Sequence, residues 1–133
     1  MACDEPGLLI SRTYPVEYDE LNNQFCWIGS EGTIQLVLPV TPAQPLKCAL
    51  KLIPHPRVDI TAIQIQVNDQ DIPHANVPKR EMVELQFEVP TGSHAQISIL
   101  LLNLMSIRPS DSGENTDDRQ LAARFFGVEL TAI

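Results

Sequence analysis

Residues 83–89 read Val-Glu-Leu-Gln-Phe-Glu-Val, the most regular alternation of apolar and polar side chains in the 133-residue chain. Successive side chains of a β-strand point to opposite faces of the sheet, so this pattern predicts a strand with one buried face and one wet face. Strands of this kind are typical of antiparallel sheets. The segment therefore indicates an all-β fold, and other segments extend the pattern.

Short strands separated by turn-forming residues run along the whole chain. In the last one, Phe126, Val128 and Leu130 are expected to face the core, while Gly127 and Glu129 face solvent. Strands punctuated this regularly by Gly, Pro, Asn and Asp favour a β-sandwich or barrel. Besides 83–89, the predicted strands are 24–28, 33–40, 48–52, 63–67, 95–101 and 126–132, with one more from 8–18, which makes seven or eight.

Little helix is expected. The only predicted helical turn covers 117–123, where Asp117 or Asp118 could cap residues 119–122. The polar stretch 109–118 is interpreted as a long exposed loop, because the strand that follows it is needed to complete the sheet. We therefore expect a single β-sandwich domain over residues 1–133.

Charge composition argues against two classes of partner. The chain has 9 Lys and Arg against 17 Asp and Glu, a formal net charge of -8. A chain this acidic is a poor partner for a phosphate backbone or an anionic membrane surface, so we expect no nucleic-acid binding. The longest apolar stretch, 97–105, is about half of the roughly 20 residues that a membrane-spanning helix needs, so no membrane span is expected.

The number and spacing of the cysteines indicate a reducing compartment. Cys3, Cys26 and Cys48 are an odd number, without the paired spacing of a zinc site or the density of a disulfide scaffold. The start of the chain is acidic where a signal peptide needs basic residues. These features predict a cytoplasmic protein, and Cys26 and Cys48, placed in apolar strands, are interpreted as packing residues.

Catalytic and cofactor motifs are not found in the sequence. His55, His74 and His94 are isolated from one another, without the spacing that brings two imidazoles to one metal. No nucleophile elbow, phosphate-binding loop or dinucleotide fingerprint occurs. We therefore expect no cofactor, no metal and no enzymatic activity.

The acidic side chains of the predicted loop could bind calcium. Asp111, Glu114, Asp117 and Asp118 offer the hard oxygen ligands that Ca²⁺ prefers, but their spacing does not follow the EF-hand pattern. An exposed acidic loop explains them without a metal.

Three residues are the candidate ligand-binding set. Trp27 is the only tryptophan, and an indole can stack on the apolar face of a sugar ring. Asp118 can accept hydrogen bonds from hydroxyls, and Arg119 can donate in a forked geometry. The structural alternatives are a core or strand-end position for Trp27, and an internal ion pair between Asp118 and Arg119 that pins the loop to the sheet.

Two tyrosines could add to such a site. Tyr14 and Tyr18, with acidic residues beside them, could form an aromatic and acidic rim. The alternative is an edge strand that packs against the sandwich.

Several local patterns in order resemble a known family. They are Phe25-Cys26-Trp27-Ile28-Gly29 before the strand 33–38, Ile65-Gln66-Val67-Asn68-Asp69 with Ile72-Pro73 behind it, 85–90, and Asp118-Arg119-Gln120-Leu121 before the last strand. From Tyr14 to Leu130 the chain resembles the jelly-roll β-sandwich accessory domains of bacterial surface-polysaccharide glycosyltransferases. These are similar in outline to galactose-binding-like and carbohydrate-binding modules. The resemblance implies an antiparallel jelly roll, a saccharide ligand and a glycosyltransferase partner.

Three functions follow as hypotheses. The first is a non-catalytic binding module for a carbohydrate or a glycosylation-related partner. The alternative is a protein-interaction or oligomerisation domain, in which Val37, Leu100 and Leu102, on outward strand positions, form a contact such as a homodimer interface. The third is a small cupin-like enzyme, which would need clustered histidine and glutamate ligands.

Overall fold

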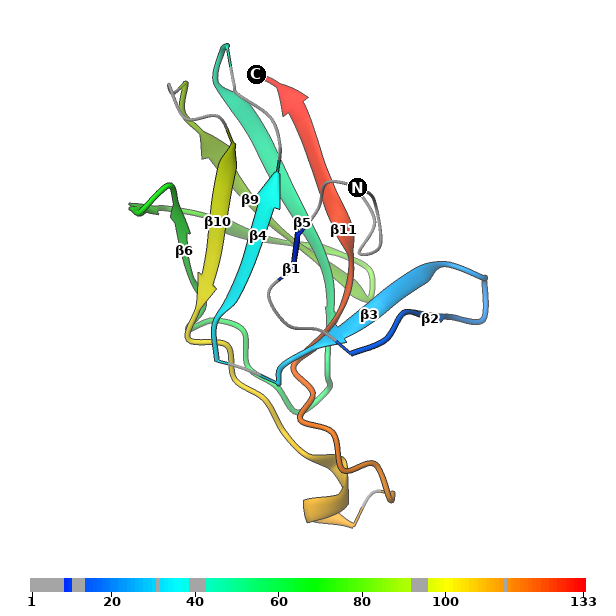
Figure 1. Ribbon diagram of the computed structural model, residues 1–133. Coiled ribbons are helices and arrows are strands. Elements are labelled where there is room, and N and C mark those ends of the chain that lie inside the picture. Colours follow the sequence, from blue (N-terminus) through cyan, green and yellow to red (C-terminus); the bar gives the residue numbers. More distant parts are fainter. Residues whose placement is uncertain (1–8, 11–13, 31, 39–42, 92–95, 114) are drawn as a thin grey trace.

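The computed structural model describes residues 9–10, 14–30, 32–38, 43–91, 96–113 and 115–133. They form two antiparallel β-sheets packed face to face, with one short 3₁₀ helix (Figure 1). The predicted all-β sandwich is confirmed. Residues that carried predictions but lie outside the described residues are Cys3, Val40, His94, Ala95 and Glu114.

The strand order is that of a jelly roll. One sheet has the order β1-β4-β10-β6-β7 and the other β2-β3-β11-β5-β9-β8. The strands β3, β11, β5 and β9 lie side by side opposite β4, β10, β6 and β7, which is the eight-stranded arrangement of two Greek keys. The bounds are β1 Leu9–Ile10, β2 Glu17–Tyr18, β3 Gln24–Ile28, β4 Ile34–Leu38, β5 Leu46–Pro54, β6 Gln64–Val67, β7 Gln70–Ile72, β8 Ala75–Lys79, β9 Met82–Val89, β10 Ile97–Leu102 and β11 Ala123–Ala132.

The core lies between the two sheets and is built from alternate strand residues. On β9, Leu85, Phe87 and Val89 are buried, as the alternation in 83–89 predicts. Each buried aliphatic or aromatic side chain of this size contributes about 1.5–3 kcal/mol relative to an exposed one. Other fully buried core residues are Ile34, Leu36, Leu38, Leu50, Leu52, Ile65, Ile97, Ile99 and Leu101.

Two short strands, β7 and β8, were not predicted, and the region 8–18, expected to give one strand, contributes β1 and β2 to different sheets. The chain turns sharply at Asn68 and Asp69, whose φ angles of 48° and 68° suit a two-residue hairpin turn, and this turn joins β6 to β7. A second tight turn at Arg80, with φ 64°, joins β8 to β9. Turn-forming residues stand at both places in the sequence, but Pro73 and Pro78 argue against strands next to them.

The orientation predicted for Phe126 was wrong. A β-bulge occurs in β11: Phe125 is opposite Leu52, Gly127 is opposite Lys51, and Phe126 is the extra residue between them. Gly127 has φ 143°, a conformation that favours glycine. The bulge turns Phe125 into the core and leaves Phe126 half-buried on the outer face, while Val128 is buried as expected.

The predicted helical turn at 117–123 was also wrong. The 3₁₀ helix η1 is Pro109–Ser112, where proline pre-sets the first φ and Gly113 closes the turn with φ 76°. In place of a helix, Leu121 forms a β-bridge with Ile107. None of the helical segments described is long or apolar enough to cross a membrane.

The segment 109–118 projects from one end of the sandwich, at the bottom of Figure 1. The backbone N–H of Ser110 donates to the carbonyl of Asp117 at 2.9 Å, and the Ser110 hydroxyl donates to the Asp118 carboxylate at 2.5 Å. Most of its described residues are exposed. It is a loop whose two ends are hydrogen-bonded to each other.

Candidate functional site

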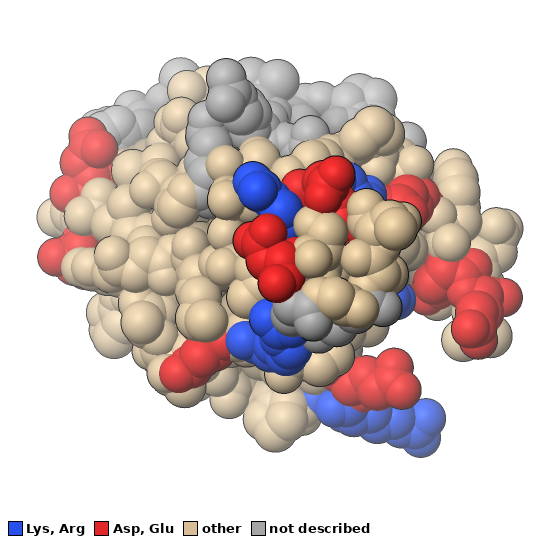
Figure 2. Space-filling model, turned by 90° about the horizontal axis from the view of Figure 1, so that it is seen from below, with Lys and Arg blue, Asp and Glu red and all other residues tan. Residues whose placement is uncertain are grey.

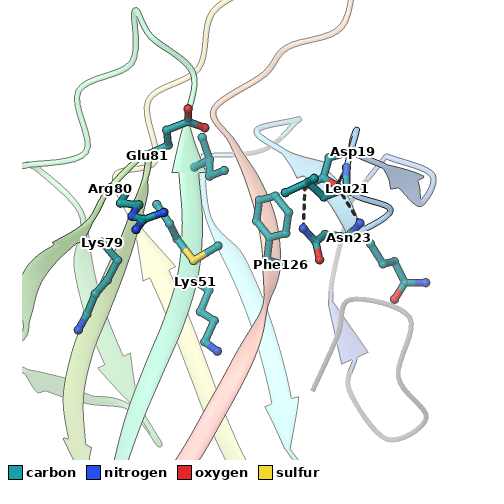
Figure 3. Close-up of a pocket in the computed structure, with 11 residues that line it drawn as sticks. Asp19, Leu21, Asn23, Lys51, Lys79, Arg80, Glu81 and Phe126 are labelled. Atoms are coloured by element: carbon teal, nitrogen blue, oxygen red, sulfur yellow. Dashed lines mark hydrogen bonds between the residues drawn. The ribbon is translucent and has the colours of Figure 1, made fainter.

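An open groove crosses the outer face of the six-stranded sheet between two hairpins. The β2–β3 hairpin lines one side with Asp19 and Leu21, and the β8–β9 turn lines the other with Arg80 and Glu81 (Figure 3). Its volume is about 630 Å³. That lies within the roughly 300–1,000 Å³ that small-molecule sites occupy.

The strands between the hairpins give this groove an apolar floor. Ile53 of β5, Met82 of β9 and Phe126 of β11 are half-buried and line it. The ring of Phe126 packs against that of Phe25, with centroids 5.5 Å apart. The β11 bulge therefore supplies the aromatic side chain of the floor.

Asp19 organises the β2–β3 hairpin. Its carboxylate accepts hydrogen bonds from the backbone N–H groups of Leu21 at 3.0 Å and Asn23 at 2.8 Å, and from the Asn23 side chain at 3.2 Å. These bonds, led by that from the Asn23 backbone, lower the pKa of Asp19. Leu21 and Tyr18 are held out into solvent, with 83% and 60% of their surfaces exposed.

The opposite wall is charged. Lys79, Arg80 and Glu81 are exposed at the β8–β9 turn and line the groove. Among the described residues, no ion pair holds any of these three side chains. They are available to a ligand.

A second groove adjoins the first. The two share Asp19, Leu21, Ile53 and Glu81, so they are parts of one continuous depression. The second part has a volume of about 580 Å³. The residues that it adds are Tyr18, Glu20, Phe25 and Arg124.

Trp27 lies beside this depression and does not line either part of it. Its half-buried ring contacts the Arg124 guanidinium, whose carbon is 5.3 Å from the ring centroid, and Arg124 also covers Phe25 at 5.1 Å. His55 packs beside the same indole, with ring centroids 6.3 Å apart. Trp27 is thus packed within an aromatic and cationic row near the end of β3, half-buried and outside the core cluster.

Arg119 joins the end of the loop to the N-terminal edge of the sheet. It donates to both oxygens of Asp117, at 2.8–3.3 Å, and to Glu17 of β2 at 3.1 Å. Its guanidinium lies 5.5 Å from the ring centroid of Tyr14, whose hydroxyl accepts the Gln120 N–H. The internal ion pair expected between Asp118 and Arg119 is not formed; Arg119 pairs with Asp117 and Glu17 and in this way fixes the end of the loop to the sheet.

Asp118 is exposed, accepts a hydrogen bond from the Ser110 hydroxyl and is not a partner in the ion pairs of Arg119. Acidic and basic side chains alternate over the end of the molecule seen in Figure 2. Among the described residues, no three His, Cys, Asp or Glu side chains cluster as metal ligands would. Trp27, Asp118 and Arg119 thus do not form one cleft with the grooves.

We expect Asp117→Asn to reduce the acid sensitivity of folding. Hydrogen bonds from Arg119 lower the pKa of Asp117 from 3.8 to about 2. Such a carboxylate stabilises the fold above about pH 4, and its contribution is lost as the pH falls toward 2. Thermal unfolding followed from neutral to acidic pH should show a shallower loss of stability for Asp117→Asn than for wild type. Asp118→Asn is the control. Equal pH profiles of stability for all three proteins would refute a stabilising pairing of Asp117 with Arg119.

The outer face of the five-stranded sheet differs from the groove. Val37, Leu100 and Leu102 are half-buried there. Polar side chains share this face, with Gln35 donating to Ser98 at 3.0 Å. The three apolar residues are therefore interspersed with polar groups.

The described cysteines are packing residues. Cys26 and Cys48 are free and buried in the core. Burial raises the pKa of Cys48 to about 12, so its thiolate is scarcely populated near neutral pH.

The groove residues were not identified from the sequence. Tyr18 and the acidic residues beside it, Asp19 and Glu20, were the exception: they line the depression, while Tyr14 packs against Arg119. Lys79 and Arg80 were not among the candidate site residues. The sequence signal that could have located this wall of the groove is the run of three charged residues at 79–81, directly before the most regular strand.

No protein-family model matches this chain, and no curated protein shows detectable similarity to it.

Proposed function

We propose that this chain is a non-catalytic binding module that holds a saccharide in the depression between the β2–β3 and β8–β9 hairpins. The observation that carries the proposal is the combination of an apolar floor at Ile53 and Phe126 with polar walls on both sides. A sugar ring has an apolar face that packs on such a floor, and a rim of hydroxyls that bind carboxylate, ammonium and guanidinium groups.

The scaffold of the depression supports binding. Its floor belongs to β5, β9 and β11, which pair over most of their length, and Asp19 holds one wall in place through three hydrogen bonds. Walls fixed before binding lose little conformational entropy when a ligand enters. The lowered pKa of Asp19 favours the ionised form, which accepts hydrogen bonds from hydroxyls and is a poor proton donor.

The sequence resemblance suggests a setting for this binding. In it, the module acts in a bacterial cytoplasm and presents a saccharide to a glycosyltransferase partner. The proposal about the depression does not depend on that partner.

Neutralising the β8–β9 wall should weaken saccharide binding and leave the fold intact. Titration calorimetry against neutral glucose, galactose and mannose oligomers should show binding to wild type. Arg80→Gln and Glu81→Gln should each lower the affinity by about 5–30-fold, since each removes a hydrogen bond to a charged group worth roughly 1–2 kcal/mol. Both side chains are exposed, so thermal stability should be unchanged.

Arg108→Gln and Asp111→Asn are matched controls, because both residues are exposed near the projecting loop and outside the depression. They should bind as wild type does. The proposal is wrong if no oligomer binds, or if the wall variants and these controls have the same affinity.

A further inference from the structure

A polar hollow continues the depression along the outer face of the six-stranded sheet. It has a volume of about 120 Å³, and Lys47, Ala49, Gln86 and Glu129 are among its lining residues. Lys51, which lines the main groove, forms an ion pair with Glu129 at 2.9 Å. The ion pair therefore links the lining of the groove to that of the hollow.

Strand β5 runs beneath both the main groove and the hollow. Residues 47, 49, 51 and 53 occupy alternate positions of β5, so their side chains share the outer face. From Lys47 to Ile53 the strand rises about 20 Å, at about 3.3 Å per residue. Both parts of the depression and the hollow lie along this stretch of β5, and we call the three together the track, with Phe126 toward its apolar end and Gln86 toward its polar end.

The charge of the track is unlike that of the rest of the chain. Five acidic and five basic side chains line its three parts, so its formal charge is zero. The chain has 9 basic and 17 acidic residues, so the remaining 4 basic and 12 acidic residues carry the whole net charge of -8. The basic residues of the track are Lys47, Lys51, Lys79, Arg80 and Arg124.

From these observations we infer that the ligand is a linear, uncharged oligosaccharide that lies along β5, with one end on the apolar floor at Ile53 and Phe126 and the other over Ala49. This inference rests on the proposed function and specifies the ligand class and its direction. A balanced set of donors and acceptors suits a chain of hydroxyls, and a track longer than one sugar ring gives successive units their own contacts.

A peptide fits this track less well. Extended peptides gain affinity by adding to a sheet edge, where unpaired backbone groups are available. The track lies over the face of β5, whose backbone pairs with β11 on one side and β9 on the other. Recognition here must come from side chains, which favours a ligand covered with hydroxyls.

The test is how affinity depends on ligand length. We would titrate unbranched glucose and galactose oligomers, from dimers to hexamers, into the full chain. The longest oligomers should bind about tenfold more tightly than the dimers. Ala49→Tyr and Thr131→Tyr, which fill the polar end, should remove that gain, so that the longest oligomers bind no more tightly than the dimers.

Gln64→Tyr is the control, because Gln64 is exposed on a strand of the opposite sheet. It should keep the gain with length. Affinity should also be the same at low and high salt, because an uncharged ligand displaces no counterions.

Two results would overturn the inference and leave the proposed function standing: equal affinity for all lengths, or tighter, salt-sensitive binding of sulfated oligomers. Binding of unstructured peptides with no saccharide binding would overturn both.

Discussion

Replacing Gly29 with alanine should lower the free energy of unfolding by about 3 kcal/mol or more, through backbone strain and overpacking. Gly29 follows β3 and has φ 135°, where L side chains are rarely found. An added Cβ would lie 2.5 Å from the backbone nitrogen of Ala122 and 2.9 Å from the carbonyl carbon of Leu121. Both neighbours are backbone atoms, so no side chain can rotate away to make room.

The same clash would break local pairing. The Ala122 N–H donates to the Ile28 carbonyl at 2.7 Å, directly before β11 begins. Any shift that relieves the Cβ contact moves this donor. The start of β11 also carries Arg124, so the aromatic row at Trp27 should be disturbed together with stability.

Gly32→Ala is the matched control, because a Cβ at Gly32 meets nothing within 4 Å. Urea unfolding monitored by Trp27 fluorescence should give a lower midpoint for Gly29→Ala and a midpoint near that of wild type for Gly32→Ala. Equal midpoints would show that the approach of Ala122 to Gly29 does not constrain the fold.

Alternation in the sequence was sufficient for most of the sandwich. The predicted strand Val83 to Val89 lies within β9, and the apolar positions of β4 and β10 are buried as their two-residue period predicts. This works because one face of each strand is buried against the opposite sheet. The jelly-roll order came from the family resemblance, since periodicity alone does not say which strands are neighbours.

The features that the sequence did not predict correctly each have a local cause. The strand β7 has only three residues and no alternating apolar face. In 117–123, Asp117 accepts the Arg119 N–H as a helix cap would, but Leu121 pairs with Ile107 in a β-bridge, so no helical turn follows. In β11, a single-residue bulge reverses which phenylalanine faces the core, and a two-residue period cannot anticipate an insertion.

The candidate site was harder to predict than the fold. Its walls come from hairpins far apart in sequence, and its floor from β5, β9 and β11, so no local motif contains it. Trp27 was singled out because it is the only tryptophan. Its environment is set by Arg124, which reaches it only through the pairing of β11 with β3.

Replacing Phe125 should destabilise the fold much more than replacing its neighbour Phe126. Phe125 is 2% exposed in the core, so Phe125→Ala should lower the free energy of unfolding by about 3–5 kcal/mol through lost burial and a cavity. Phe126 is half-buried on the outer face, so Phe126→Ala should cost only about 1 kcal/mol. Chemical denaturation of the two variants measures this difference.

Binding should show the reverse order. Phe126 lines the groove, so Phe126→Ala should abolish measurable saccharide binding in a protein that remains folded. Phe125→Leu keeps most of the buried volume and should bind as wild type does. Because one extra residue in β11 separates the two roles, equal stability losses for the two alanine variants would contradict the bulge. Undiminished binding by Phe126→Ala would instead contradict the proposal that the saccharide binds in this groove, since the floor would then contribute nothing to affinity.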